Sequence, residues 1–455
     1  MSRPISNDAS NRVIHRTSEA SLFTHNTKSL LALFLVAGIV GAISWHLLAV
    51  VAIQHPTAQN FSSQANVGYD FGVYYLAAKT LVSGGDIYHI PYNAFSWLAK
   101  GWYPTYLYPP PSIYFFVPFT IFTFDQARIA VAGVYVAALL LTIFFTTKIL
   151  RGYGVSLSRL ALLLMGASVF LFEPIALTFA ALNVNVLILF LITLFYYFLF
   201  AKKRATISGV VLGIATLIKV IPVILILLDP LHKLSKKLAI SSIATLAVGS
   251  ILSLWLQGIS AWRSFLEAFL KFESGFPSKE SILSPTVGDV NVSITTTIVK
   301  IATVLNLNVS TALLILDFVK AVFILGTFLY LFKISKIKIT DTKEWEILSF
   351  TLLLLSILAV ANVVEPYYAS LLILSFILVI FVVPLTRCEK VILWVSLALF
   401  AARTEILSLF WRIGGALKIG AYIVEPPTVA YVLLIALLFY MIKQRTKHGY
   451  WSAPA

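Results

Sequence analysis

The sequence is poor in charge and almost devoid of cysteine. Of its 455 residues, 12% are charged and 59% are apolar, and the mean hydropathy is +0.92. Soluble domains carry about 25% charged residues, so this composition excludes an ordinary soluble globular protein. The single cysteine, Cys388, excludes an intramolecular disulfide and a cysteine-based metal cluster.

Three other features are missing. The sequence contains no glycine-rich phosphate loop, no internal repeat and no low-complexity tract. Without a phosphate loop, direct use of a soluble nucleotide is disfavoured. Without a repeat, the sequence shows none of the pseudo-symmetry on which many transporters are built.

Apolar runs are abundant, and many approach the length that crosses a bilayer, about 20 residues. They predict an all-α polytopic membrane protein with about twelve transmembrane helices. The predicted spans are Leu30–Gln54, Ser112–Phe124, Ile129–Thr147, Ser158–Phe172, Val184–Phe200, Ile207–Leu228, Leu238–Leu256, Val309–Phe332, Trp345–Val360, Tyr367–Pro384, Val391–Phe410 and Ile419–Ile442. The first run follows a polar tail, and we interpret it as a retained span rather than a cleaved signal peptide.

The net charge is +15, and the basic residues gather in the tails and short loops. This distribution follows the positive-inside rule, so it indicates a membrane topology and not nucleic-acid binding. It predicts cytoplasmic tails at residues 1–29 and 443–455, on either side of a single transmembrane domain at residues 30–442.

The first half of the chain fits this topology poorly. Simple alternation of the spans places two basic segments, Lys148–Arg159 and Lys202–Arg204, on the non-cytoplasmic side. Several spans between Ser112 and Leu228 are also short for a hydrocarbon core about 30 Å thick. We therefore expect re-entrant or broken helices in this part of the chain, as occur around buried sites.

Two outer-face loops, residues 55–111 and 257–308, stand apart from the spans. In the first, Asp70 opens a stretch with apolar residues at three- and four-residue steps, which Gly84-Gly85 closes. The pattern predicts a short amphipathic helix at the membrane surface. Asp70 is then either an N-cap or a functional acid, and Asp86 is either a turn residue or a second acid. The many tyrosines of this loop form either an interfacial belt or a surface for sugars.

Polar residues inside apolar runs are candidates for a site. Lys219 lies one helical turn before Pro222, where a charge is costly and should face a cavity or a partner; the alternative is a snorkelling lysine. Asn183 and Asn185 either bond between helices or line a site. Arg263, in the second outer loop, is a weaker candidate, because an amphipathic surface helix would also explain it.

Two further acids, Glu365 and Asp317, lie in or beside apolar runs. Glu365 lies at the outer end of a span by charge alternation, so we expect it to line the same site as Asp70, or to act as an alternate base. A cation site of Asp70, Asp86 and Glu365 stays open, because carboxylates suit Mg²⁺ or Mn²⁺. Asp317 and Lys320 lie one turn apart and are expected to pair with each other.

The two stretches "YDFGVYYLAAKTLVSGGDIY" and "YPPPSIYFFVPF" together resemble the first extracytoplasmic loop of the C-type, polytopic glycosyltransferases. The chain is most similar to glycosyltransferase family 87, the polyprenol-phosphate-mannose-dependent α-mannosyltransferases. Three later stretches agree: "ALNVNVLILFL", "SGVVLGIATLIKVIPVILIL" and "NVSI". Two departures stand out. The family's usual Gly-Gln is Leu182-Asn183 here, and "VVEPYY" lacks the histidine of the acid–His–Tyr cluster that many relatives carry.

The resemblance implies that a sugar, most simply mannose, moves from a polyprenyl-phosphate donor to an acceptor hydroxyl, with inversion at the anomeric carbon. Asp70 would be the general base, and Lys219 and Arg263 would bind the donor phosphate. The residues expected to contact the sugar or the acceptor are Tyr74, Asp86, Tyr108, Asn183, Asn185, Asn291, Ser293, Glu365 and Tyr367. No cofactor and no metal are demanded.

The implied acceptor is a glycolipid or a glycan, and the implied location is the outer face of the cell membrane. Two alternatives remain. A transporter or flippase of lipid-linked sugar would also be polytopic with buried charges, but it would favour symmetric halves over a one-sided acidic loop. A catalytically inactive relative that serves as an assembly subunit is the third possibility.

Overall fold

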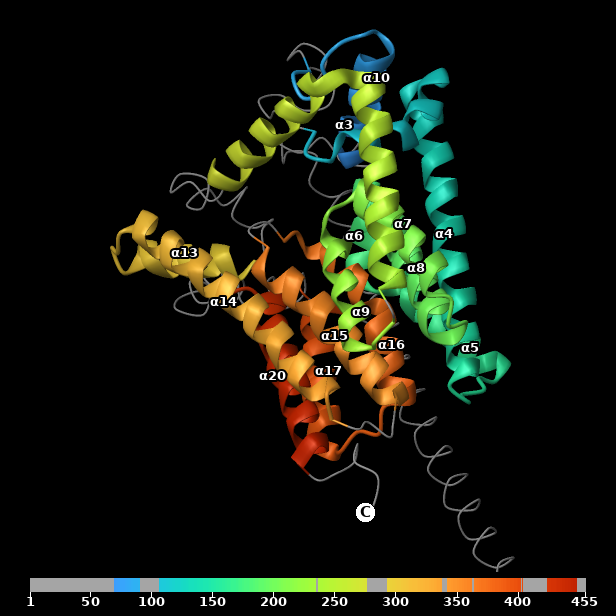
Figure 1. The fold of residues 1–455 in the computed structure, drawn as a ribbon, viewed down its shortest axis with the longest axis vertical. Coiled ribbons are helices and arrows are strands. Elements are labelled where there is room, and N and C mark those ends of the chain that lie inside the picture. Colours follow the sequence, from blue (N-terminus) through green and yellow to red (C-terminus); the bar gives the residue numbers. More distant parts are fainter. Residues whose placement is uncertain are drawn as a thin grey trace, which may run out of the picture.

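The structure is a computed structural model. It describes residues 69–90, 106–234, 236–275, 293–337, 342–361, 364–401, 403 and 424–447. Every regular element in these ranges is a helix, so the predicted all-α class is confirmed (Figure 1). The first predicted span, Leu30–Gln54, lies outside the described residues.

The first outer loop contains the predicted short helix, α3, Tyr69–Val82. Burial is not confined to one face of it, because Val73 and Ala77 are buried as well as Phe71, Tyr74 and Ala78, so the predicted amphipathic surface helix is instead largely enclosed. The chain leaves it through Gly84, whose φ of 78° suits glycine. Asp70 lies within the first turn of α3. Its carboxylate accepts hydrogen bonds from other elements and not from the start of its own helix, so the N-cap interpretation is wrong.

The predicted span Ser112–Phe124 is not a membrane-spanning helix. It forms two 3-10 helices, η2 (Pro110–Phe115) and η3 (Val117–Ile121), which pack against α3. Each begins with proline in its first turn, and proline both fixes φ and removes a backbone donor. The apolar character of this segment therefore serves packing beneath α3 rather than a membrane crossing.

Four helices in the described ranges are long and apolar enough to cross a membrane. They are α4 (Phe124–Gly152), α10 (Lys237–Gly275), α14 (Val309–Ser335) and α20 (Pro426–Lys447). The pair α5 (Arg159–Leu171) and α6 (Glu173–Ala181), bent by 54°, makes a fifth if it counts as one span. The predicted count of twelve is therefore not confirmed.

Shorter helices complete the bundle. They are α7 (Asn185–Tyr196), its π-helical continuation η4 (Tyr197–Ala201), α15 (Thr342–Val360), η6 (Pro366–Leu372), α16 (Ile373–Val382), α17 (Arg387–Ala401) and the peripheral α13 (Ile294–Val304). Nearly all residues of α7 and α15 are buried. The long helices instead expose apolar side chains such as Trp255 and Leu314, as expected of surfaces that contact lipid.

The predicted span Ile207–Leu228 is a broken, re-entrant hairpin. α8 (Ala205–Ile218) ends at Lys219, whose φ of −147° and ψ of 130° are extended. The chain then returns through the 3-10 helix η5 (Ile221–Leu227) and the single turn α9 (Leu228–Leu231). The proline in the first turn of η5 explains why α8 does not continue.

Contacts at the two ends of this hairpin establish its return. The backbone N–H of Arg204, just before α8, donates to the Phe198 carbonyl at 2.7 Å. The ring of His232, just after α9, lies 5.0 Å from the ring of Phe200. Both ends therefore lie beside η4, and Lys219 is at the tip. The expectation of broken or re-entrant helices is confirmed here.

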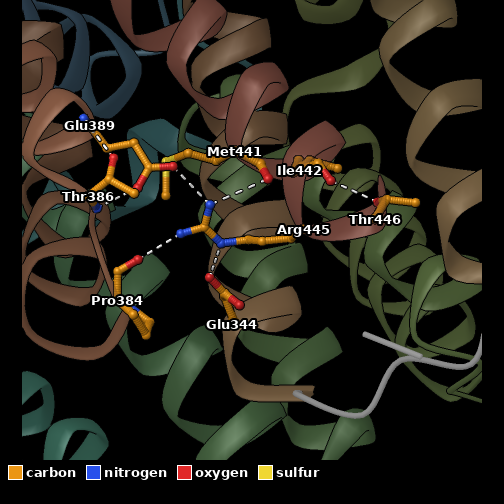
Figure 2. Close-up of polar contacts among 8 residues, drawn as sticks. All are labelled: Glu344, Pro384, Thr386, Glu389, Met441, Ile442, Arg445 and Thr446. Atoms are coloured by element: carbon orange, nitrogen blue, oxygen red, sulfur yellow. Dashed lines mark hydrogen bonds and ion pairs between the residues drawn. The ribbon is translucent and has the colours of Figure 1, made fainter. Parts of the chain in front are cut away.

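The bundle has two ends, which we name by a residue or helix at each. At the Arg445 end, Arg445 of α20 donates to Glu344 of α15, to Glu389 Oε1 at 3.0 Å and to the Pro384 carbonyl at 2.7 Å (Figure 2). At the opposite end, α3 lies beside the bend of α10 (Figure 1); we call it the α3 end.

The basic segments that fitted the predicted topology poorly also lie at the Arg445 end. Tyr153, which follows α4, donates through its hydroxyl to Glu346 Oε2 at 2.8 Å. Lys203, which precedes α8, donates to Glu346 Oε1 at 2.6 Å. Because Glu346 lies near the start of α15, two residues from Glu344, the segments at Tyr153 and Lys203 share the end of Arg445. Simple alternation of the predicted spans does not hold in this part of the chain because Ser112–Phe124 is not a span.

Candidate functional site

Asp70 lies where three distant parts of the chain meet at the α3 end. Asn183 Nδ2 donates to Asp70 Oδ2 at 2.7 Å, and the Tyr367 hydroxyl donates to the same oxygen at 3.0 Å. No hydrogen bond from the described residues reaches Oδ1. One oxygen of Asp70 is therefore held from the protein interior, and the other can accept a proton.

Asn183 is fixed by the break between α6 and α7. Leu182 takes the left-handed conformation, with φ of 49°, and ends α6. The Asn183 side-chain oxygen then accepts from the Asn185 backbone N–H at 2.9 Å. Since that oxygen is engaged, the amide nitrogen must face Asp70. Its second contact is the Tyr74 hydroxyl, at 3.2 Å.

A wall of tyrosines completes one side of the site. The hydroxyls of Tyr74 and Tyr108 lie 2.7 Å apart, and their rings meet edge to face. Tyr88 donates to the Tyr108 carbonyl at 2.7 Å and so fixes the backbone before η2. These tyrosines shape the site and do not merely belong to an interfacial belt.

Lys219, at the tip of the re-entrant hairpin, reaches the same site. Its Nζ donates to Asn185 Oδ1 at 2.7 Å and lies 3.8 Å from the centroid of the Tyr368 ring. The Tyr108 ring is 5.7 Å from the same nitrogen. The ammonium is thus bound by an amide and covered by an aromatic face, both favourable to a buried cation. A snorkelling lysine, extended to the membrane surface, does not fit these contacts.

Glu365 is the second acid of the site. It immediately precedes η6, whose Tyr367 binds Asp70 and whose Tyr368 covers Lys219. The Glu365 carboxyl interacts electrostatically with both Asp70 and Lys219. The site therefore combines two carboxyl groups and one ammonium group.

Burial differs among the residues of the site. Tyr74, Asn183, Asn185, Lys219 and Tyr367 are buried. Asp70, Tyr108, Glu365 and Tyr368 are partly exposed as whole residues.

The surroundings raise the pKa of both carboxyl groups. Burial raises the pKa of Asp70 to about 6, against the lowering effects of the Asn183 hydrogen bond and the Lys219 charge. Burial and the Asp70 charge raise the pKa of Glu365 to about 8, against the effect of Lys219.

Other predicted site residues are not part of this cluster. Asp86 accepts from Ser264 at 2.9 Å and binds the Tyr88 backbone N–H, so it joins the first outer loop to α10. Arg263 is exposed on the same part of α10. Ser293 caps α13 by accepting from the Thr296 backbone at 3.1 Å. Asn291 lies outside the described residues.

The cation site formed by Asp70, Asp86 and Glu365 does not assemble. In the described part of the chain, no three His, Cys, Asp or Glu residues come together. The expected pairing of Asp317 with Lys320 is present, at 3.3 Å.

Sequence reasoning missed Tyr368. The residue is visible in the quoted "VVEPYY", but nothing in that string indicates that its ring lies over Lys219. The available signal was an aromatic residue beside an acid at the outer end of a span, together with an intramembrane lysine that needed a partner.

The fold and the site together define a helical membrane protein whose polar centre is built at breaks in its helices. Glycosyltransferase family 87 matches residues 106–360, more than half of the chain. The chain belongs to this family and is a glycosyltransferase. A comparison with curated proteins returns no match. The family match includes Tyr108, Asn183, Asn185 and Lys219, whereas Asp70 precedes it and Glu365 follows it.

Proposed function

We propose that this glycosyltransferase moves mannose from a polyprenyl-phosphate donor to a hydroxyl of a glycolipid or glycan acceptor, with inversion and with Asp70 as the general base. The observation that carries the proposal is the Asp70 carboxylate, whose Oδ2 is bound twice and whose Oδ1 accepts no hydrogen bond from the residues that the structure describes. Inverting transfer needs one base beside the acceptor hydroxyl and no second, nucleophilic carboxylate.

The pKa of Asp70 suits this role. A general base works best when its pKa lies close to the working pH, and burial brings that of Asp70 to about 6. The proton acceptor is the ionised form, so the transfer rate should fall as the pH drops through about 6. Lys219 lies near enough to interact with Asp70, and its charge favours the phosphate that leaves.

An apolar groove supports a lipid-linked donor. It has a volume of about 460 Å³ and is lined by Leu227, Lys320, Ala321, Ile324, Leu325, Phe328 and Val360. Its walls are η5, α14 and α15. η5 begins just after Lys219, and α15 ends shortly before Glu365. Val360, at the end of α15, is the lining residue nearest in sequence to the site, whereas Leu227 lies at the far end of η5 from Lys219, so the groove offers a surface for a lipid chain but does not by itself locate its phosphate.

The positive-inside rule gives the orientation. Basic residues concentrate at the Arg445 end, which we assign to the cytoplasm, so Asp70 and the α3 end face outward. Nucleotide-linked donors are cytoplasmic, which also favours a lipid carrier for the sugar. We place the protein in the cell membrane on these grounds.

The first test replaces Asp70 with asparagine. The D70N variant should lose roughly 10²- to 10⁴-fold in transfer rate, because the base is gone while the shape is kept. The control is D86N, since Asp86 lies in a surface contact with Ser264 and should retain activity. Unchanged turnover in a well-folded D70N variant would refute the assignment of Asp70 as the general base. If the wild type itself shows no transfer, an inactive relative that serves as an assembly subunit would be favoured.

The second test identifies the donor. The purified protein is incubated with polyprenyl-phosphate mannose, glucose and arabinose, and the products are read by mass spectrometry, with NMR for the anomer formed. We expect transfer from the mannose donor and an α-linkage from a β-linked donor.

An A321W variant, which fills the groove, should raise KM for a long-chain donor. The KM for a single-isoprene donor should be unchanged.

A further inference from the structure

Asn185, the first residue of α7, connects the carboxylate of the site with its ammonium group. Its backbone N–H donates to Asn183 Oδ1 at 2.9 Å, and Asn183 Nδ2 donates to Asp70 Oδ2 at 2.7 Å. Its side-chain Oδ1 accepts from Lys219 Nζ at 2.7 Å. One residue therefore stands between Asp70 of α3 and Lys219 at the tip of the re-entrant hairpin.

A third contact closes a ring of hydrogen bonds. Asn185 Nδ2 donates to the Tyr367 carbonyl at 3.5 Å, and the Tyr367 hydroxyl donates to Asp70 Oδ2 at 3.0 Å. The path from Asp70 through Asn183, Asn185 and Tyr367 thus returns to Asp70, and it joins α3, the α6–α7 break and η6. Lys219 is attached to this ring through Asn185. Polar contacts, and not helix packing alone, therefore set the separation of Lys219 from Asp70.

The amide of Asn185 can face its partners in only one way. An ammonium group donates and does not accept, so the amide oxygen must face Lys219. The amide nitrogen then faces the Tyr367 carbonyl, which only accepts. The Asn185 residue is 0% exposed. Both ends of its amide are therefore directed at groups of the protein.

The neutral charge of this amide is as important as its position. In the described part of the chain, the groups in direct contact with Lys219 Nζ are the Asn185 amide and the Tyr368 ring, which are both neutral. A carboxylate in place of the amide would pair with the ammonium and cancel much of its charge. An amide holds the ammonium and leaves its charge available to an anion.

We propose that Asn185 is a positioning residue of the transfer, which fixes the Lys219 ammonium relative to the Asp70 carboxylate and does not itself bind the sugar. The inference rests on the proposed function, since it requires a phosphate that leaves while an acceptor hydroxyl attacks. In an inverting transfer these two oxygens lie on opposite faces of the sugar ring. A base and a cation that serve them must keep a fixed separation, and a small displacement of either one is costly in rate.

The main test is a double-mutant cycle, measured as kcat/KM of the purified full chain with polyprenyl-phosphate mannose. N185L keeps the approximate size of the side chain and removes both amide contacts, so kcat/KM should fall about 10²-fold. K219M should lower it by about 10²-fold as well. Because Asn185 acts through Lys219, the N185L/K219M variant should lie within about threefold of K219M alone.

Two further variants separate this role from folding. N185D keeps an acceptor for Lys219 and should have a thermal unfolding midpoint close to that of the wild type. Its kcat/KM should nevertheless fall by about 10-fold or more, because the carboxylate pairs with the ammonium. The control is T193V on the same helix, since Thr193 is equally buried and donates only to the Leu189 carbonyl of α7. T193V should keep the wild-type kcat/KM.

Four results would overturn the proposal. A double variant about 10²-fold slower than K219M would show that Asn185 acts independently of Lys219, for instance on the sugar. A well-folded N185L variant with a lower unfolding midpoint and an unchanged kcat/KM would show a structural role only. A wild-type kcat/KM in N185D, or in K219M, would show that the charge held by Asn185 is not used.

These results are distinct from a failure of the proposed function. Each of them can occur while D70N is inactive, so the general base and the transfer reaction would stand. Transfer that survives in D70N would instead refute the proposed function, whatever the outcome of the cycle.

Discussion

Charge is handled in opposite ways at the two ends of the bundle. At the Arg445 end, Arg445 donates to two carboxylates and to the backbone carbonyls of Pro384 and Met441 (Figure 2). At the α3 end, Asp70 is bound by an amide and a phenol, and Lys219 by an amide and a ring. In the described residues, neither the Asp70 carboxyl group nor the Glu365 carboxyl group forms a direct salt bridge.

The difference separates a structural cluster from a functional one. A buried ion pair with all its hydrogen bonds made is costly to break and has nothing left to offer a substrate. A carboxylate held by neutral donors keeps its basicity and one open oxygen. Four substitutions test this contrast, and they follow from the largest expected effect to the smallest.

The largest effect is expected on stability at the Arg445 end. R445M removes the guanidinium that pairs with the buried Glu344 and Glu389, so the free energy of unfolding should fall by about 3–5 kcal/mol. The measurement is the thermal unfolding midpoint in detergent. The matched control is K447M on the same helix end, where the lysine is exposed. If R445M were as stable as K447M, the structural reading of this cluster would be wrong.

The second effect is expected on the pH dependence at the α3 end. N183D removes the donor to Asp70 Oδ2 and places a second acid 2.7 Å from it, so the pKa of Asp70 should rise. The acid limb of the transfer rate should move to higher pH, and the rate at pH 7 should fall about 10- to 100-fold. A loss of rate with no change in the acid limb would show that Asn183 acts in another way, for instance on the substrate.

The third effect concerns the packing that holds Lys219 in place. α8 and α10 approach through small residues, and a Cβ at Gly213 would lie 2.5 Å from Thr245 Cβ. G213A should therefore separate the helices at a cost of about 1–3 kcal/mol, with loss of activity as the hairpin tip shifts. The control is G133A on α4, where a Cβ meets nothing within 4 Å. Equal melting temperatures for the two variants would contradict this close contact.

The smallest effect is expected at an ion pair between one exposed and one buried residue. Lys203 is exposed although its partner Glu346 is buried, and Glu346 also accepts from the Tyr153 hydroxyl. K203M should cost less than about 1 kcal/mol, because solvent screens the lysine. A loss of stability comparable to that of R445M would mean that solvent exposure does not explain the difference between the Lys203–Glu346 pair and the Arg445 cluster.

Several features could be predicted because they depend on local pattern. The spacing of apolar residues after Asp70, and the glycines that end the stretch, predicted α3. Lys219 before Pro222 predicted a break with a buried cation, and the structure has both. Hydropathy failed at Ser112–Phe124, because a buried apolar segment and a membrane span have the same composition.

The assembly of the site could not be predicted in the same way. Asn183 is buried and its amide contacts Asp70, Tyr74 and the Asn185 backbone, which no local pattern indicated; its contact with sugar stays a prediction. Asp86 resembles Asp70 in the sequence, since both are acids in one tyrosine-rich loop, yet only Asp70 joins Lys219. Such choices depend on contacts between residues more than 100 positions apart.

The sequence by itself determined the membrane class, the helical elements and the residue types able to do acid–base chemistry, because composition and periodicity act locally. Only the tertiary structure decided which carboxyl oxygen is open, which acid is raised furthest in pKa and which cation is covered. The physical reason is that hydrogen bonding and desolvation depend on what surrounds a group in space. Here those surroundings come from α3, the α6–α7 break, the hairpin tip and η6 together.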